Sequence, residues 1–178
     1  MRKVAICYGT RYGTTKEIVQ EMAKIAEEAG ANVEIVELKK KRLASPITDY
    51  DLILIGSGIQ TGQWTKEPLK FLEDNLEHLS TQKIALFVVC GDAGNPDLCD
   101  EAQKNYLDAI AERYPGLTPI STGLFAGMFD FKRYNFVVRS LIKKIIKNRA
   151  PEGEELPEVM DFRNWDMIKE WTLNVIQM

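Results

Sequence analysis

Short apolar runs alternate with longer amphipathic stretches along most of the chain. Lys3–Tyr8, Asp51–Gly56 and Lys83–Cys90 are mostly apolar and too short for helices, which is typical of strands buried on both faces of a parallel sheet. Asn32–Leu38 alternates apolar and polar residues, and Thr118–Gly127 is a further short apolar segment. The pattern therefore predicts five strands.

Amphipathic stretches lie between and after these strands. Behind the first strand, apolar residues fall at the spacing of one helix face: Ile18, Met22, Ile25 and Ala29. Further helices are expected after Thr65, over about Cys99–Tyr114, over Lys132–Arg149 and from Asn164 or Asp166. Because strands and helices alternate, we predict an α/β fold, a doubly wound parallel sheet with helices on both faces. A length of 178 residues suits a single domain, 1–178.

Three loops follow the first, third and fourth predicted strands, at 9–15, 57–64 and 91–95, and all are rich in glycine and small polar residues. The carboxyl ends of parallel strands meet at one edge of a sheet, where ligands bind. The first loop opens a helix, whose N-terminus favours an anion such as a phosphate. The other two loops can flank a flat polar ring and hydrogen-bond its edge through the backbone. Together they predict a site for flavin mononucleotide (FMN).

The predicted cofactor-binding residues come from these loops: Thr10, Arg11, Tyr12, Gly13, Thr14, Thr15, Ser57, Gly58, Ile59, Gln60, Thr61, Gly62, Trp64, Cys90, Gly91, Asp92, Ala93 and Gly94. The first loop has a second interpretation, because Thr14–Glu17 fits a helix capping box. It matches neither a Walker loop nor a dinucleotide-binding fingerprint. We predict no catalytic side chain and no metal ligand set.

The run Thr10–Thr15 resembles the phosphate loop of flavodoxins, with Tyr12 where many members have threonine. Gly56–Gly62 and Cys90–Asp92 resemble the second and third flavin loops of that family. The resemblance implies a flavodoxin-like five-stranded sheet of order 2-1-3-4-5 with FMN bound at its edge. Many flavodoxins hold the ring between a tryptophan and a tyrosine, whereas this chain has Gln60 near the expected tryptophan. Trp64 is either a substitute for that tryptophan or a surface or interface residue.

The segment Lys132–Arg149 holds seven Lys or Arg and no Asp or Glu, whereas the whole chain has a net charge of −3. It is either an ordinary packed helix with a solvated basic face, or a docking surface for an acidic protein or an anionic membrane. We describe 132–161 as an insertion before the last helix. With this insertion, the chain resembles the flavodoxin-type, quinone-dependent protoporphyrinogen oxidases, whose members associate with the membrane.

The sequence is compatible with three functions. The preferred prediction is a flavodoxin-type electron carrier that shuttles electrons between redox partner proteins. The alternative is an oxidase that passes electrons from a porphyrinogen to a quinone, with Phe125–Tyr134 as a substrate wall. The third is a flavin-free regulatory module of the same fold. The slightly acidic composition argues against a nucleic acid as the binding partner. Cysteine is sparse and no apolar run is long enough to cross a bilayer, so we predict a cytoplasmic protein, or one peripheral at the membrane.

Overall fold

A parallel sheet forms the centre of the molecule in the computed structural model, which describes residues 1–147 and 157–178. Its five parallel strands run in the order β2-β1-β3-β5-β6, so the predicted order 2-1-3-4-5 is confirmed. The strands are β1 (Lys3–Gly9), β2 (Asn32–Glu37), β3 (Leu52–Gln60), β5 (Ile84–Cys90) and β6 (Ser121–Ala126). A two-residue strand, β4 (Gln63–Trp64), pairs antiparallel with the end of β3.

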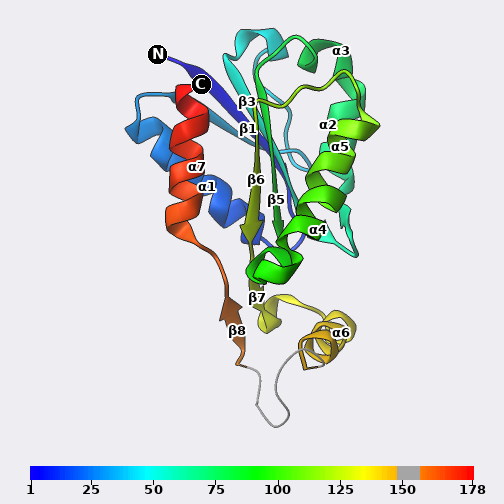
Figure 1. The fold of residues 1–178 in the computed structure, drawn as a ribbon. Coiled ribbons are helices and arrows are strands. Elements are labelled where there is room, and N and C mark those ends of the chain that lie inside the picture. The colour runs from blue at the N-terminus through cyan, green and yellow to red at the C-terminus, as the bar shows by residue number, and fades with distance from the viewer. Residues whose placement is uncertain (148–156) are drawn as a thin grey trace.

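Helices cover both faces of the sheet (Figure 1). One face carries α1 (Thr14–Glu28) and α7 (Trp165–Gln177). The other face carries α2 (Lys66–Asp74), α3 (Leu76–Leu79), α4 (Cys99–Gln103) and α5 (Ala109–Arg113), with a π-helical turn, Lys104–Asp108, between the last two. Short 3-10 turns lie at Ile47–Asp49, Asp92–Gly94, Pro96–Leu98 and Phe131–Arg133. The hydrophobic core is therefore in two layers, one on each side of the sheet.

The central strands are apolar throughout because both of their faces are covered. Every residue of β5 is buried, whereas β2, at the edge, is buried at only one position. Gly56 of β3 is required by packing, since a Cβ there would lie 2.1 Å from Cζ of Phe87. The two layers are thus built around the strands that the apolar runs predicted.

After β6 the chain leaves the sheet and forms a separate small lobe. β7 (Met128–Asp130) pairs antiparallel with β8 (Val159–Asp161), and α6 (Phe136–Lys147) lies between them in sequence. We call the described residues 128–147 and 157–161 the α6 lobe. Figure 1 shows it beyond the carboxyl ends of the parallel strands, next to the predicted cofactor loops.

The bounds of several elements differ from the predictions. The fifth strand begins at Ser121 rather than at residue 118, and the basic helix begins at Phe136 because residues 131–133 form a 3-10 turn. The end of that helix, Arg149, and the adjoining residues up to 156 lie outside the described part of the chain. The last helix begins at Trp165, where the Asn164 side chain accepts a hydrogen bond from the backbone of Met167. Among the described helices, none has the length and apolar character to cross a bilayer.

Candidate functional site

The first loop turns sharply from β1 into α1. Gly13 has φ of 92°, in the left-handed region that favours glycine, and its N–H donates to Oγ1 of Thr10 over 3.1 Å. α1 then begins at Thr14, and the N–H groups of its first three residues have no partner within the helix. These donors and the neighbouring threonine hydroxyls form a site for an anion.

The capping box predicted for Thr14–Glu17 is not formed. Gly13 is the N-cap residue of α1, and no side chain caps the helix. The hydroxyl of Thr14 instead donates to the carbonyl of Met128 over 3.4 Å, and Glu17 pairs with two arginines described below. The interpretation as an ordinary capped helix is therefore wrong.

The second loop follows the buried part of β3. Thr61 and Gly62 have φ of 48° and 75°, which form the tight turn between β3 and β4. Gly58 lies against the first loop, because a Cβ there would approach Oγ1 of Thr15 to 2.9 Å. Ser57 is fully buried and accepts a hydrogen bond from the N–H of Thr65 over 2.8 Å, so its side chain holds the loop together.

The third loop begins at Cys90, the last residue of β5. Burial raises the pKa of the Cys90 thiol to about 11, so the thiol is neutral near pH 7. The hydroxyl of Tyr106, on the π-helical turn, donates to Asp92 over 3.1 Å. Burial, and then the charge of Asp92, raise the pKa of Tyr106 to about 12. The π-helical turn thereby ties α4 and α5 to the loop.

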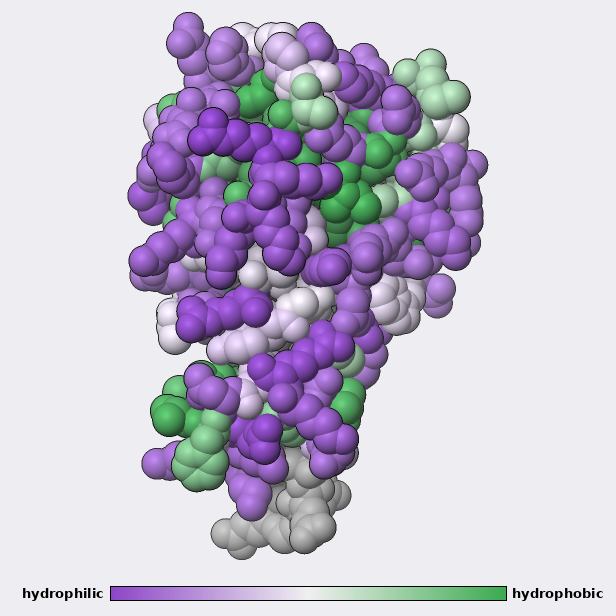
Figure 2. Space-filling model, turned by 180° about the vertical axis from the view of Figure 1, so that it is seen from behind, coloured by the Kyte–Doolittle hydropathy of each residue, from purple (hydrophilic) through white to green (hydrophobic). Residues whose placement is uncertain are grey.

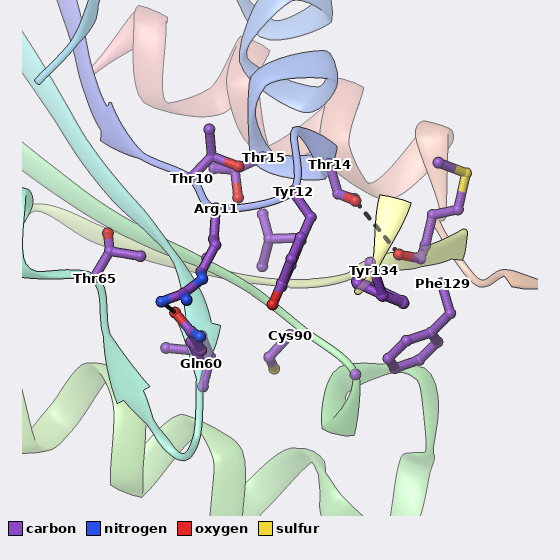
Figure 3. Close-up of a pocket in the computed structure, with 16 residues that line it drawn as sticks. Thr10, Arg11, Tyr12, Thr14, Thr15, Gln60, Thr65, Cys90, Phe129 and Tyr134 are labelled. Carbon is purple, nitrogen blue, oxygen red and sulfur yellow. Dashed lines mark hydrogen bonds between the residues drawn. The ribbon is translucent and has the colours of Figure 1, made fainter. Parts of the chain in front are cut away.

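These loops surround a cavity of about 90 Å³ (Figure 3). Arg11 donates to Oε1 of Gln60 over 3.0 Å and so joins the first two loops across it. The ring of Tyr12 points into the cavity toward Cys90, and its centroid lies 4.6 Å from that of Tyr134 in an edge-to-face contact. The lining residues are Thr10, Arg11, Tyr12, Thr14, Thr15, Gly58, Ile59, Gln60, Thr65, Val89, Cys90, Gly91, Gly127, Met128, Phe129 and Tyr134.

A larger cavity, about 560 Å³, adjoins the first and shares Tyr12, Cys90 and Phe129 with it. Its far wall comes from the α6 lobe and the residue that follows it: Val138, Leu141, Ile142, Ile145, Ile146, Met160 and Phe162. The wall is aliphatic and aromatic, so this compartment suits a bulky apolar molecule placed against the loops. We call it the α6 cavity.

The structure brings most of the predicted site residues together. Ten of them line the smaller cavity, and Thr61, Gly62, Asp92 and Gly94 line the α6 cavity. Ser57 and Ala93 line neither, while Gly13 shapes the first loop from behind.

The prediction for Trp64 is wrong in both of its forms. Trp64 is neither in the cavities nor at the surface, because it is only 6% exposed and belongs to the core layer beneath β3. Its indole N–H donates to the carbonyl of Tyr106 over 2.6 Å. The turn at Thr61 and Gly62 pairs β4 back onto β3 and so directs this side chain inward.

Six residues that line the smaller cavity are not among the predicted cofactor-binding residues, although four of them lie in Phe125–Tyr134, which the alternative prediction makes a substrate wall. Thr65 and Val89 flank the predicted loops, and the other four follow β6: Gly127, Met128, Phe129 and Tyr134. A signal was present, because an aromatic run follows directly after the fifth strand, at the same sheet edge as the other loops. The structure places aromatic rings at the cavity from this run rather than from the second or third loop.

Two arginines of the α6 lobe and its boundary meet one carboxylate of α1. Glu17 lies 2.8 Å from Nη2 of Arg133 and 2.6 Å from Nη1 of Arg163. Burial alone would raise the pKa of Glu17, but the hydrogen bonds from Arg163 and Arg133 outweigh it and lower the pKa. Glu17 is therefore ionised at neutral pH, and the ion pairs weaken as the pH falls through that lowered pKa.

A family model described as a flavodoxin domain matches residues 5–155 of the chain. The chain belongs to the flavodoxin domain family. A protein named protoporphyrinogen IX dehydrogenase [quinone] from Leishmania major is 26% identical over 170 residues, which are 95% of this chain and 72% of that one. A protein of the same name from Escherichia coli (strain K12) is 23% identical over 177 residues, 99% of this chain and 96% of that one.

Solved structures agree on the fold. Oxidised flavodoxin 1 from Bacillus cereus superposes with a TM-score of 0.56 at 16% identity, covering 98% of this chain and 97% of that one. The predicted fold family is thereby confirmed, and FMN is the cofactor that fits it.

The residues present fit FMN in three respects. The first turn of α1 offers unpaired N–H donors for the phosphate, with Thr15 only 2% exposed at its base. Gly58 and Gly91 have no Cβ where one would press against Thr15 or Phe129, which leaves backbone available to a ring edge. Tyr12, Phe129 and Tyr134 supply aromatic surface beside these loops.

Proposed function

We propose that this chain is an FMN-dependent oxidoreductase that takes reducing equivalents from a bulky cyclic substrate of the porphyrinogen class and passes them to a quinone. The α6 cavity carries the proposal. A carrier that exchanges electrons with partner proteins needs only an exposed ring edge, whereas a compartment of about 560 Å³ with an apolar wall suits a bound ligand. The names of the two relatives described above support the same substrate and acceptor.

Each part of the site has a role in this proposal. FMN, when bound, supplies the chemistry that accepts and returns the two reducing equivalents. The first loop holds its phosphate, and backbone groups of the second and third loops hold the edge of its ring. Tyr12, Phe129 and Tyr134 line both the smaller cavity and the α6 cavity, and the wall from α6 excludes water from the substrate.

A direct test uses the FMN-loaded protein without oxygen. Adding protoporphyrinogen should bleach the visible flavin absorbance, and a water-soluble quinone should restore it. A porphyrin with no hydrogens to give up should leave the spectrum unchanged. No bleaching by protoporphyrinogen would contradict the proposed substrate.

The electron carrier is the second candidate. It is favoured by the described lining of the smaller cavity, which holds no histidine, lysine or carboxylate that could act as a general base. If the protein is a carrier, a flavoprotein reductase will reduce its FMN while protoporphyrinogen will not.

We also propose that the outer face of α6 docks on an anionic membrane. Phe136 and Val137 are 82% and 73% exposed, and neither lines the α6 cavity. Figure 2 shows apolar side chains gathered on the outside of this lobe. The described helix also carries Arg139, Lys143, Lys144 and Lys147 with no acidic residue. Apolar side chains among basic ones are typical of helices that lie in a lipid interface.

Replacing Val137 with aspartate should weaken binding to vesicles of phosphatidylglycerol and phosphatidylcholine by about tenfold, because it removes apolar surface and adds repulsion. Sedimentation with the vesicles measures this. Met167→Asp is the matched control, since Met167 is 40% exposed on α7, far along the chain from α6, and should bind like the original protein. Equal binding of both variants would remove the proposed docking face.

A further inference from the structure

Arg133 of the α6 lobe lies against the outside of the first loop. Its Nη1 donates to the backbone carbonyl of Tyr12 over 3.3 Å, and a Cβ on Gly13 would stand only 3.4 Å from the same nitrogen. Tyr12 and Gly13 are 120 or more positions earlier in the chain. The loop that opens α1 is therefore held from behind by a residue of the lobe.

The same guanidinium is fixed from two other directions. Its Nη2 lies 2.8 Å from Glu17 in the first turn of α1, and its Nε donates to Asp130 over 3.1 Å. Each of the three nitrogens thus contacts a different segment. A planar guanidinium can satisfy three fixed acceptors in this way, whereas a lysine ammonium is a single charge on a flexible stem.

Glu17 pairs with a second arginine as well. Its second oxygen is occupied by Arg163, which is also paired with Asp161 over 2.6 Å. The side chain of Arg163 is 9% exposed, so this part of the network is sheltered from solvent. The side chain of Arg163 donates to Glu17, Met128 and Asp161 rather than to the first loop, which makes it a natural comparison for Arg133.

We infer that Arg133 is a positioning residue for the phosphate of FMN. It fixes the carbonyl of Tyr12 and the left-handed turn at Gly13, so that the N–H groups that follow are already oriented toward an anion. The inference rests on FMN binding at this loop. The α6 lobe would then have two roles: it lines the substrate cavity, and through the guanidinium of Arg133 it orients the phosphate site.

The test compares FMN with riboflavin, which lacks the phosphate. In Arg133→Gln, the ratio of the riboflavin and FMN dissociation constants should fall about tenfold, equivalent to about 1.4 kcal/mol. Arg133→Lys should show a similar fall in this ratio, because lysine keeps the positive charge but lacks the planar guanidinium. Arg163→Gln should lower the melting temperature while keeping the ratio within about twofold of the original.

Three results would overturn the inference: an unchanged ratio in Arg133→Gln, a fully retained ratio in Arg133→Lys, or an equal fall in Arg163→Gln. The second result would show that charge alone suffices. If neither flavin bound the original protein, the FMN site itself would fail, which is a separate outcome from a ratio that does not respond.

A measurement on the unmodified protein covers the case in which the variants do not fold. Coupling between two sites is reciprocal, so phosphate binding must stabilise the contact that prepares its site. FMN should slow amide hydrogen exchange in the segment 128–134 more than saturating riboflavin does. Equal protection by the two flavins would contradict the role given to Arg133.

Discussion

Replacing Gly56 with alanine is expected to destabilise the native protein by about 3 kcal/mol, at the upper end for an overpacked core. The added Cβ would lie 2.1 Å from the ring of Phe87, which is fully buried. That ring cannot move aside easily, because Phe125 and Trp171 pack around it with centroids 6.4 and 6.2 Å away. Urea unfolding monitored by circular dichroism measures the loss.

Gly116→Ala is the control for this prediction. A Cβ at Gly116 would make ordinary contacts, the nearest at 3.7 Å, so its effect should stay within about 0.5 kcal/mol. A loss below about 1 kcal/mol in Gly56→Ala would show that the strand and ring can separate more readily than dense core packing implies.

Replacing Ile142 with aspartate is expected to lower kcat/KM for protoporphyrinogen by about 100-fold, equivalent to about 2.7 kcal/mol. Ile142 is half-buried in the apolar wall of the α6 cavity, where a carboxylate would either lose hydration or repel the substrate's own carboxylates. FMN affinity should stay unchanged, because Ile142 does not line the smaller cavity.

Ser140→Asp is the matched variant, because it adds the same charge to the exposed side of α6. It should keep kcat/KM within about twofold when the assay contains no vesicles. Stopped-flow bleaching of the flavin separates the reductive step from reoxidation by quinone. If both variants reacted with protoporphyrinogen as the original protein does, the α6 cavity would not be the substrate site.

The fold was predictable because its signals are local. Apolar runs such as Lys83–Cys90 can only be buried strands, and three glycine-rich loops directly after such runs must meet at one sheet edge. Fourteen of the predicted residues consequently line one or other cavity. The order and direction of the strands are therefore enough to predict most of the residues that line the cavities from these loops.

Other features depend on contacts between distant residues, which no local pattern records. Trp64 is of a residue type that can stack on a flavin ring, yet the turn at Thr61 and Gly62 directs its side chain into the core. Thr14–Glu17 has the spacing of a capping box, yet Glu17 is taken by arginines 116 and 146 positions away. β7 and β8 have three residues each, too few to show a period, and they pair only because the chain returns to the same point.

The pairing of β7 with β8 has a consequence for how such proteins diversify. The chain leaves the parallel sheet after β6, and the two ends of the segment that carries α6 lie side by side, with Asp130 opposite Val159. A descendant that joined these two positions by a tight turn would keep every strand of the parallel sheet and α7, while losing Arg133 and the part of the apolar wall that α6 supplies. Under the proposed function, loss of the segment between β7 and β8 would change a flavoprotein that binds a substrate into an electron carrier, and gain of the segment would do the reverse. Neither change would alter the loops that bind the nucleotide.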